Sequence, residues 1–504
     1  MTRASAQTRS LPLRALTAAL VALFALDNIL LLGLIGQPPL LVAALALILP
    51  LALAFVTYRA MPGHCRIGVP TIGLCLLVAA LLLLLGGEGR LFHATADWQI
   101  RDAVLGDMGR HRWPFDYWLD GQAQLLRAPV GMYLVPALLG GASQLGRDWA
   151  LLGHNSLILG LLLAQGSALF EGRRARLIAL TIFVMFSGLD IAGNLIRLWA
   201  TGGADWDHIE RWSGYYQYSA HITQIFWVPQ HALAGWTVAL AYLLWRKGLA
   251  PIGLFTASMA LVALWSPLAL LGALPFAAFA GLRALLTGAW SRWDIGLGVI
   301  AAATTVPALL YLSTDAATVG GGFRSPFLPA YVLVLLIEVV PFVLPLLRDR
   351  RKGTDRTTVM IAALCLFLMP LWSIGASNDF QMRASIMPLA LIALAFADWA
   401  SRLEQWGEKA FVLVVVALGA VTGGFEIARA LRFAPSPVPH CSLAGVWDRQ
   451  TGLVVPHASY FAARDSFPFT ITPPSRVSGA HPDRCWDRPW RVPHGAMPTQ
   501  QGRP

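Results

Sequence analysis

The residues best suited to chemistry gather in one stretch of an otherwise apolar chain, "LFHATADWQIRDAVLGDMGRHRWPFDYW", at residues 91–118. Acids, arginines and aromatic residues are mixed here, whereas the residues just before are almost pure Leu, Val and Ala. A carboxylate in such a place can take a proton from an attacking hydroxyl group. We therefore predict Asp97 as a catalytic base and Asp102 as the alternative. Arg101 follows Asp97 by four residues, so the two can pair, or Arg101 can neutralise a phosphate.

A short helix must position these side chains. Thr95 can cap a helix that begins at Ala96, and Gly109 can end it. Asp97 then falls in the first turn, where a carboxylate also suits the helix dipole. On a regular helix Asp102 is turned roughly 140° away from Asp97. The two acids cannot both point at one reacting atom, so one is predicted to be chemical and the other structural.

Arginines in later polar segments suit the binding of a phosphate group. Arg324 follows the glycine run Gly320–Gly322, whose composition is typical of a mobile loop. Arg383 lies at the start of an apolar run, where its planar guanidinium can clamp a lipid phosphate. Asp379 precedes it by four residues and can also simply pair with it. The predicted donor-binding residues are Arg101, Arg127, His221, Gln230, His231, Arg324, Asn378, Asp379 and Arg383.

A further polar segment offers metal ligands and histidines. Asp205 and Asp207 form a D-x-D pair, which can bind Mg²⁺ or Mn²⁺ through oxygen ligands, although the pattern is common by chance. No other cofactor is indicated. His221, Gln230 and His231 abut an apolar run, where polar groups are costly unless they face a cavity or a partner.

The elements that carry these residues are predicted to be membrane helices. The chain of 504 residues is 56% hydrophobic and 13% charged, whereas a soluble domain carries about a quarter charged residues. Apolar runs of roughly 20 residues, long enough to cross a bilayer, recur along it. We expect an all-α integral membrane protein with about 13 transmembrane helices. The expected spans are residues 11–36, 38–57, 67–87, 149–170, 177–199, 226–245, 249–265, 267–283, 294–313, 328–347, 358–375, 384–400 and 411–429.

The basic residues predict the orientation. A net charge of +11 would suggest nucleic acid as a partner of a soluble chain. In a membrane protein, basic residues cluster in short loops because they keep those loops on the cytoplasmic side. This explains the positive charge, so no nucleic-acid partner is expected. With the N-terminus inside, "EGRRAR" at 171–176 and the three lysines Lys247, Lys352 and Lys409 are cytoplasmic. The short apolar segment Val130–Gly146 is then a juxtamembrane or re-entrant helix on the outer face.

The same orientation places the C-terminus outside. The outer loops are then residues 88–148, 200–225, 314–327 and 376–383, followed by the tail 430–504. Cys441 and Cys485 are the two cysteines of this tail, and an oxidising compartment allows them to form a disulfide bond.

This pattern resembles the type C (GT-C) glycosyltransferase fold, with many spans, an acidic first outer loop, arginines in later outer loops and an outward tail. The resemblance covers residues 67–429, after an N-terminal hairpin at 1–66, and "DWQIRD" supplies the family's acidic motif with Asp97 and Asp102. It implies a glycosyltransferase that takes sugar from a polyprenyl-phosphate or -diphosphate carrier. The acceptor would be a glycan, lipid or protein at the outer, periplasmic face of a bacterial inner membrane, among membrane lipids.

Two other classes of protein stay open. A lipid or glycan transporter or flippase often has inverted repeats and substrate residues near the bilayer midplane, whereas the charge here is concentrated in outer loops. A non-catalytic assembly subunit of an envelope polysaccharide system would use the tail, rich in Pro, Arg, His and Trp, to bind a partner.

Overall fold

The chain is mostly helical in the computed structural model, which describes residues 9–119, 121–349, 351, 355–375, 378–447, 459–477 and 484–490. Within these residues, seven helices are long and apolar enough to cross a membrane. This agrees with an all-helical membrane protein, while thirteen spans stay a prediction. The seven are α1 (Leu13–Leu34), α2 (Pro39–Ala60), α6 (Gln144–Gly166), α12 (Pro267–Thr287), α13 (Arg292–Ser313), the run from α14 (Leu328–Val334) to α15 (Val340–Arg348), and α19 (Trp406–Arg432).

Shorter helices complete the bundle. Six of them overlap the remaining expected spans, namely α3 (Val69–Leu85), α7 (Gly172–Val184), α10 (Pro229–Arg246), α11 (Ile252–Leu261), α16 (Arg356–Leu368) and α18 (Ile386–Ser401). The other short helices are α4 (Trp98–Arg110), α5 (Gly131–Gly140), α8 (Asp190–Thr201), α9 (His221–Trp227), α17 (Asp379–Ala384) and α20 (Leu443–Trp447). At about 1.5 Å per residue, α5 is far too short to cross a hydrocarbon core of about 30 Å.

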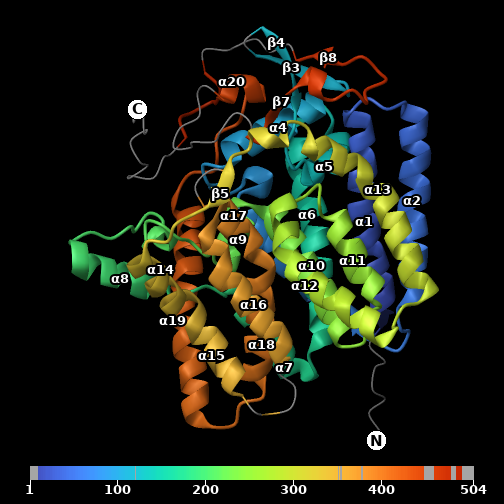
Figure 1. Ribbon diagram of the computed structural model, residues 1–504. Coiled ribbons are helices and arrows are strands. Elements are labelled where there is room, and N and C mark those ends of the chain that lie inside the picture. Colours follow the sequence, from blue (N-terminus) through green and yellow to red (C-terminus); the bar gives the residue numbers. More distant parts are fainter. Residues whose placement is uncertain are drawn as a thin grey trace, which may run out of the picture.

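The two ends of the bundle differ in character (Figure 1). One end carries α4, α20 and a four-stranded sheet, which together we call the cap. The opposite end holds the N-terminal side, where β1 (Ser10–Pro12) pairs with β2 (Arg66–Gly68). The basic segment 171–176 precedes and begins α7 at that same opposite end. Lys352, one of the three lysines used to orient the chain, lies outside the described residues.

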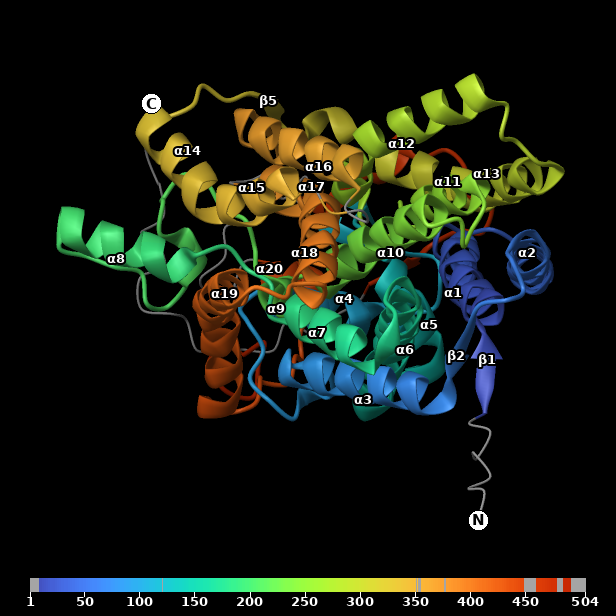
Figure 2. The same ribbon diagram turned by 90° about the horizontal axis from the view of Figure 1, so that it is seen from below.

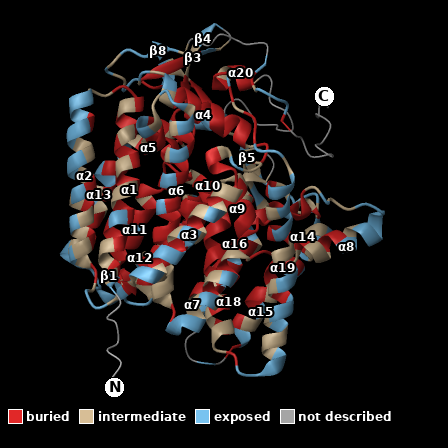
Figure 3. Ribbon diagram, turned by 180° about the vertical axis from the view of Figure 1, so that it is seen from behind, coloured by how far each residue is buried: buried red, intermediate tan, exposed pale blue. Residues whose placement is uncertain are grey.

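Much of the bundle's outer surface is apolar. On α2, the side chains of Leu47, Leu51 and Phe55 are 64%, 60% and 62% exposed. Figure 3 shows this helix largely exposed beside a buried interior. Contiguous exposed apolar surface of this extent marks contact with lipid or another protein, and here lipid is the natural neighbour because the helix has the length and hydropathy of a membrane span.

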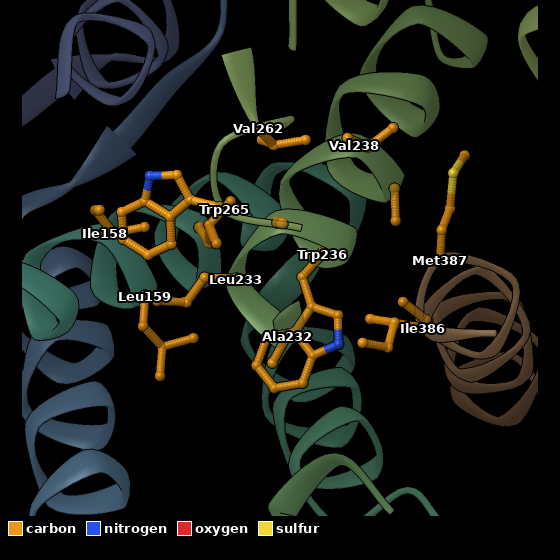
Figure 4. Packing of buried hydrophobic residues seen from close by; sticks show 14 of the residues in the cluster. Ile158, Leu159, Ala232, Leu233, Trp236, Val238, Val262, Trp265, Ile386 and Met387 are labelled. Atoms are coloured by element: carbon orange, nitrogen blue, oxygen red, sulfur yellow. The ribbon is translucent and has the colours of Figure 1, made fainter. Parts of the chain in front are cut away.

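Helix α10 forms the centre of the bundle and is buried along most of its length. It approaches α18 closely, because a Cβ atom at Gly235 would lie 2.4 Å from Cγ2 of Ile386. Figure 4 shows Trp236 of α10 beside Ile386, with Leu159 of α6 on the other side. Close packing of this kind leaves little freedom for the surrounding helices to shift.

Two expectations from the sequence are wrong. The span expected at 177–199 is not one helix, because α7 ends at Val184 and α8 begins at Asp190. At the break, the buried side chain of Glu338 packs against the backbone of Gly188. A Cβ atom at Gly188 would lie 1.6 Å from Oε2 of Glu338, so only glycine leaves room for this acid, which lies in the π-helical turn Leu335–Val339. The glycine run is also not a free loop, because strand β5 (Gly321–Phe323) pairs with β6 (Trp372–Ile374).

The cap joins segments far apart in the sequence. Its strands follow the order β7 (Phe461–Ala463), β4 (Gln122–Leu126), β3 (Phe115–Leu119) and β8 (Ser475–Arg476). The pairs β3–β4 and β4–β7 are antiparallel, and β3–β8 is parallel. Thus the two tail strands, β7 and β8, pair with opposite edges of the β3–β4 hairpin of the first large loop. A disulfide joins Cys441 and Cys485, whose Cα atoms lie 4.8 Å apart.

One buried carboxylate fastens the tail to α4. Asp107 is fully buried, and its Oδ2 accepts hydrogen bonds from the Tyr117 hydroxyl at 2.8 Å and the Leu443 backbone N–H at 2.7 Å. Its Oδ1 lies 3.1 Å from Nη2 of Arg110. A buried charge is tolerated when it is paired and hydrogen-bonded in this way.

We predict that the two ends of the bundle lie on opposite sides of the membrane. In a background without Cys65, Arg174→Cys should react with a membrane-impermeant maleimide only after the cells are permeabilised. Gln122→Cys, which is exposed on the cap, should react in intact cells. Labelling of position 174 from outside would overturn the orientation that the basic loops predict.

Candidate functional site

The start of α4 places Asp97 at the base of the cap. The helix begins at Trp98, whose indole N–H donates to the Phe226 carbonyl oxygen at 2.9 Å. The expected start at Ala96 with Thr95 as its cap is therefore wrong, and the Thr95 hydroxyl has no hydrogen-bond partner among the described residues. Asp97 occupies the N-cap position without capping through its side chain. Its carboxylate is instead available to Arg101.

Asp97 and Arg101 form the ion pair that their spacing predicts. Oδ2 of Asp97 lies 3.2 Å from Nη2 of Arg101, and the side chains are 25% and 3% exposed. Nε and Nη1 of Arg101 are buried without a hydrogen-bond partner among the described residues. Unsatisfied donors on a buried cation are costly. A bound anion would satisfy them, and the Asp97 side chain beside them is partly exposed.

Several elements bring polar side chains to this pair. The hydroxyl groups of Tyr133 on α5 and Tyr460 in the tail lie near the Arg101 guanidinium, and the Tyr133 hydroxyl is close enough to accept a hydrogen bond from it. Arg383 and Asp379 of α17 act on the same Tyr460 hydroxyl, as does Asp97. We call this group, with the neighbouring His231 of α10, the Asp97 cluster. Its members are Asp97, Arg101, Tyr133, His231, Asp379, Arg383 and Tyr460.

Arg383 is bound to its own helix neighbour. Nη1 of Arg383 lies 2.8 Å from Oδ2 of Asp379, and both side chains are a little over one-fifth exposed, at 22% and 23%. His231 is buried nearby, with Nδ1 2.8 Å from the Ser266 hydroxyl and the charges of Arg383 and Arg101 within range. The cluster therefore combines two arginines with two carboxylates at one edge of the bundle.

Asp102 points to a different network. Its Oδ2 lies 2.9 Å from Nη2 of Arg90, whose Nε lies 2.9 Å from Oδ2 of Asp148. Arg90 also donates to the Pro437 carbonyl oxygen at 2.9 Å, which brings the tail into the network. Burial raises the pKa of Asp102 to about 7, against the opposing effect of Arg90. The structure thus gives Asp102 a bracing position, and of the two acids predicted in the first loop only Asp97 belongs to the cluster.

Other predicted donor-binding residues lie elsewhere. His221 is packed in the core, with Nδ1 2.6 Å from the Phe183 carbonyl oxygen and its ring between Phe183 and Trp236. Gln230 is buried beside His231 in the first turn of α10. Because His221 is buried among aromatic side chains, its surroundings indicate packing and not substrate contact.

Arg127 directly follows β4 and Arg324 directly follows β5, and both interact with partners outside the Asp97 cluster's ion pairs. Nη1 of Arg324 donates to Oδ1 of Asn378 at 2.7 Å and thereby joins the segment after β5 to the start of α17. The backbone N–H of Arg127 donates to the Tyr460 carbonyl oxygen at 2.7 Å, which fixes the segment that carries Tyr460. Burial lowers the pKa of Arg127 from its usual value, while Tyr311 and Asp315 oppose this shift.

The D-x-D pair does not converge on a common point with other ligands. Oδ2 of Asp205 lies 3.1 Å from Nη2 of Arg211, and its Oδ1 accepts the His208 backbone N–H at 2.9 Å. In the part of the chain that the structure describes, no three His, Cys, Asp or Glu side chains gather as metal ligands. The interpretation of Asp205 and Asp207 as a metal site therefore lacks support there.

Two members of the cluster were not predicted from the sequence. Tyr133 lies in the apolar segment after the first loop, and a single tyrosine there is typical of an interface belt. Tyr460 lies in the Pro-rich tail, more than 350 residues from Asp97. The adjacent aromatic residues Tyr460 and Phe461, at the start of β7, are a local signal that this part of the tail could pair as a strand, because aromatic residues favour strands.

The chain matches no protein-family model and no curated protein, and no solved structure is similar to it.

A buried acid next to the cluster predicts a pH dependence of stability. Oε1 of Glu88 accepts from Nδ2 of Asn155 at 2.8 Å, and burial raises the pKa of Glu88 to about 8. Between the usual pKa and this value, the folded protein holds a proton that the unfolded chain has released. Stability must therefore fall as the pH rises from the usual pKa of a glutamate to about 8, and it should level off above that pH.

Glu88→Gln should remove this dependence, because the amide keeps the acceptor for Asn155 but has no charge to bury. Relative to this variant, the wild type should lose on the order of 1 kcal/mol or more between about pH 5 and about pH 8. Thermal unfolding in detergent across this range measures the difference. Glu171→Gln, an exposed acid at the other end of the molecule, is the control. A difference between wild type and Glu88→Gln that stays constant with pH would contradict the assignment.

Proposed function

We propose that this protein is a membrane glycosyltransferase that takes a sugar from a polyprenyl-phosphate carrier, with the Asp97 cluster as its active site. The observation that carries the proposal is Arg101, a buried guanidinium with unsatisfied donors, held beside the partly exposed carboxylate of Asp97. Sugar transfer from a phosphate carrier requires a cation that can bind the phosphate and a nearby carboxylate that can accept a proton. Arg101 and Asp97 provide this combination.

The reaction moves one proton and exchanges one bond. The acceptor hydroxyl oxygen attacks the anomeric carbon of the sugar and gives its proton to Asp97. The bond from that carbon to the phosphate oxygen breaks, and the electron pair leaves with the polyprenyl phosphate. Arg101 and Arg383 neutralise the charge that grows on the departing phosphate, since fixed cations in a dry site stabilise developing charge strongly.

The position of the cluster suits a donor anchored in lipid. It lies at the cap end of helices with the length and apolar surface of membrane spans, so a carrier phosphate at headgroup depth can reach it. Arginine can hold a single phosphate, so Mg²⁺ or Mn²⁺ is not required in this scheme. We place the site on the outer face of a bacterial inner membrane, with a glycan, lipid or protein acceptor arriving from the periplasm.

The strongest observation for the transporter alternative is a set of buried acids at the break between α7 and α8. Oδ2 of Asp190 accepts from the hydroxyls of Ser187 and Thr422 at 2.7 and 2.8 Å, and Oε1 of Glu338 accepts from the Trp212 indole at 2.7 Å. Intramembrane acids often mark transport paths. Here one oxygen of each acid is bound to neighbouring elements, which favours a bracing role, although Asp190 Oδ1 and Glu338 Oε2 make no hydrogen bond to the described residues.

Asp97→Asn should reduce sugar transfer by about 10²–10⁴-fold, because the amide keeps the shape but cannot accept the proton. Radiolabelled polyprenyl-phosphate hexoses and pentoses with membrane acceptors supply the assay. Asp465→Asn, an exposed acid of the same cap, is the matched control and should retain full activity. Full activity of Asp97→Asn with a dead Asp102→Asn would exchange the two roles, and activity of both variants would remove the first loop from catalysis.

Arg383→Ala should weaken donor binding by roughly 10–100-fold, as the loss of a charge-assisted hydrogen bond does. The effect should appear in the apparent KM for the donor, while the protein keeps its unfolding temperature. Asp379→Ala separates the explanations, because it removes the partner of Arg383 and leaves the guanidinium in place. If Asp379→Ala and Arg383→Ala have equal effects on donor KM, Arg383 serves the ion pair and not the phosphate.

A further inference from the structure

A second site is present at the end of the bundle opposite the cap. A cavity of about 580 Å³ lies between α3, α6, α7, α10 and α18. Its size falls in the range of small-molecule pockets, roughly 300–1,000 Å³. Seen from below, α3, α6 and α7 are neighbours at this face (Figure 2). The Asp97 cluster contributes no residue to this cavity.

The walls of the cavity are apolar and reach deep into the bundle. Leu159 of α6 and Trp236 of α10 line its inner part, and Figure 4 shows the two side chains on neighbouring helices. Phe183 of α7 closes the same region. Leu74 and Leu177, which also line it, are 42% and 45% exposed. The cavity therefore opens toward the surface that faces the hydrocarbon of the bilayer.

Two arginines stand at the mouth. Arg173 and Arg176 line the cavity in the first turns of α7, where the positive end of the helix dipole adds to their charge. Nε of Arg176 donates to the Phe170 carbonyl oxygen at 3.2 Å, which holds its guanidinium beside the opening. Neither arginine forms an ion pair with a carboxylate among the described residues. An apolar cleft with cations at one end is complementary to a lipid with an anionic headgroup.

We propose that this cavity binds an anionic phospholipid of the surrounding bilayer, with one acyl chain between α3, α6 and α7 and the phosphate at Arg173 and Arg176. Basic pockets between membrane helices at the cytoplasmic side bind anionic headgroups, and the "EGRRAR" segment is on that side in the proposed topology. The lipid would fill the space between α7 and the rest of the bundle, so it braces the short helix that ends at the α7–α8 break.

The test compares phosphatidylglycerol with phosphatidylcholine on the delipidated full-length protein, by native mass spectrometry and thermal unfolding. Phosphatidylglycerol should be retained and should raise the unfolding temperature more than phosphatidylcholine does. Arg173→Gln with Arg176→Gln should weaken phosphatidylglycerol binding roughly 30-fold, from about fivefold per arginine. Arg283→Gln with Arg292→Gln, exposed arginines flanking another helical loop of the chain, should leave it unchanged.

A second variant tests the cavity itself. Gly166 lines the cavity, and a Cβ atom there would meet nothing within 4 Å, so Gly166→Leu fills the space without a backbone clash. It should abolish retention of the lipid while the arginines stay in place. Equal binding of phosphatidylcholine, or unchanged retention by Gly166→Leu, would refute the proposal. Displacement of phosphatidylglycerol by an equimolar polyprenyl phosphate would also refute it and assign the cavity to a prenyl carrier.

Discussion

The cap depends on the burial of one negative charge. Asp107 has no access to water, so every hydrogen bond that it accepts comes from the protein: from Tyr117, from the backbone of Leu443 and from Arg110. Each donor lies on a different segment. Loss of any one partner would leave a charge buried and underpaired, which is strongly destabilising. The interaction therefore forces the first large loop and the tail into a single arrangement over the helices.

The geometry of the Asp97 cluster depends on this arrangement of the first loop and the tail. Because Asp107 fixes the far end of α4 and the Trp98 indole fixes its beginning, the Asp97 and Arg101 side chains are held between two anchors. The Arg90 network adds a third anchor through Asp102. These anchors hold the Arg101 guanidinium in place although two of its nitrogens lack hydrogen-bond partners among the described residues, because the helix cannot rotate to bring them to new partners. Fixed positioning of this kind is what the proposed catalytic role of Asp97 requires.

Local spacing predicted the parts of the site that lie on one helix. The i, i+4 spacing of Asp97 and Arg101, and of Asp379 and Arg383, led to pairs that the structure contains, and the helical angle separated Asp102 from Asp97. Hydropathy likewise predicted the helical membrane class. The contribution of Tyr460 could not be predicted, because it depends on a strand pairing between distant segments. The break before α8 was also hidden, since it depends on how closely Glu338 packs against Gly188.

The pairing of the tail with the first loop has a consequence for biogenesis. The chain is made from its N-terminus, so α4 leaves the ribosome long before Tyr460 and the cysteines of the tail. On the proposed topology, the tail must cross the membrane, oxidise Cys441 with Cys485 and dock on the first loop before the Asp97 cluster is complete. A partly inserted chain thus lacks a finished site. The proposed sugar transfer would therefore begin only in molecules whose tail has been exported and docked.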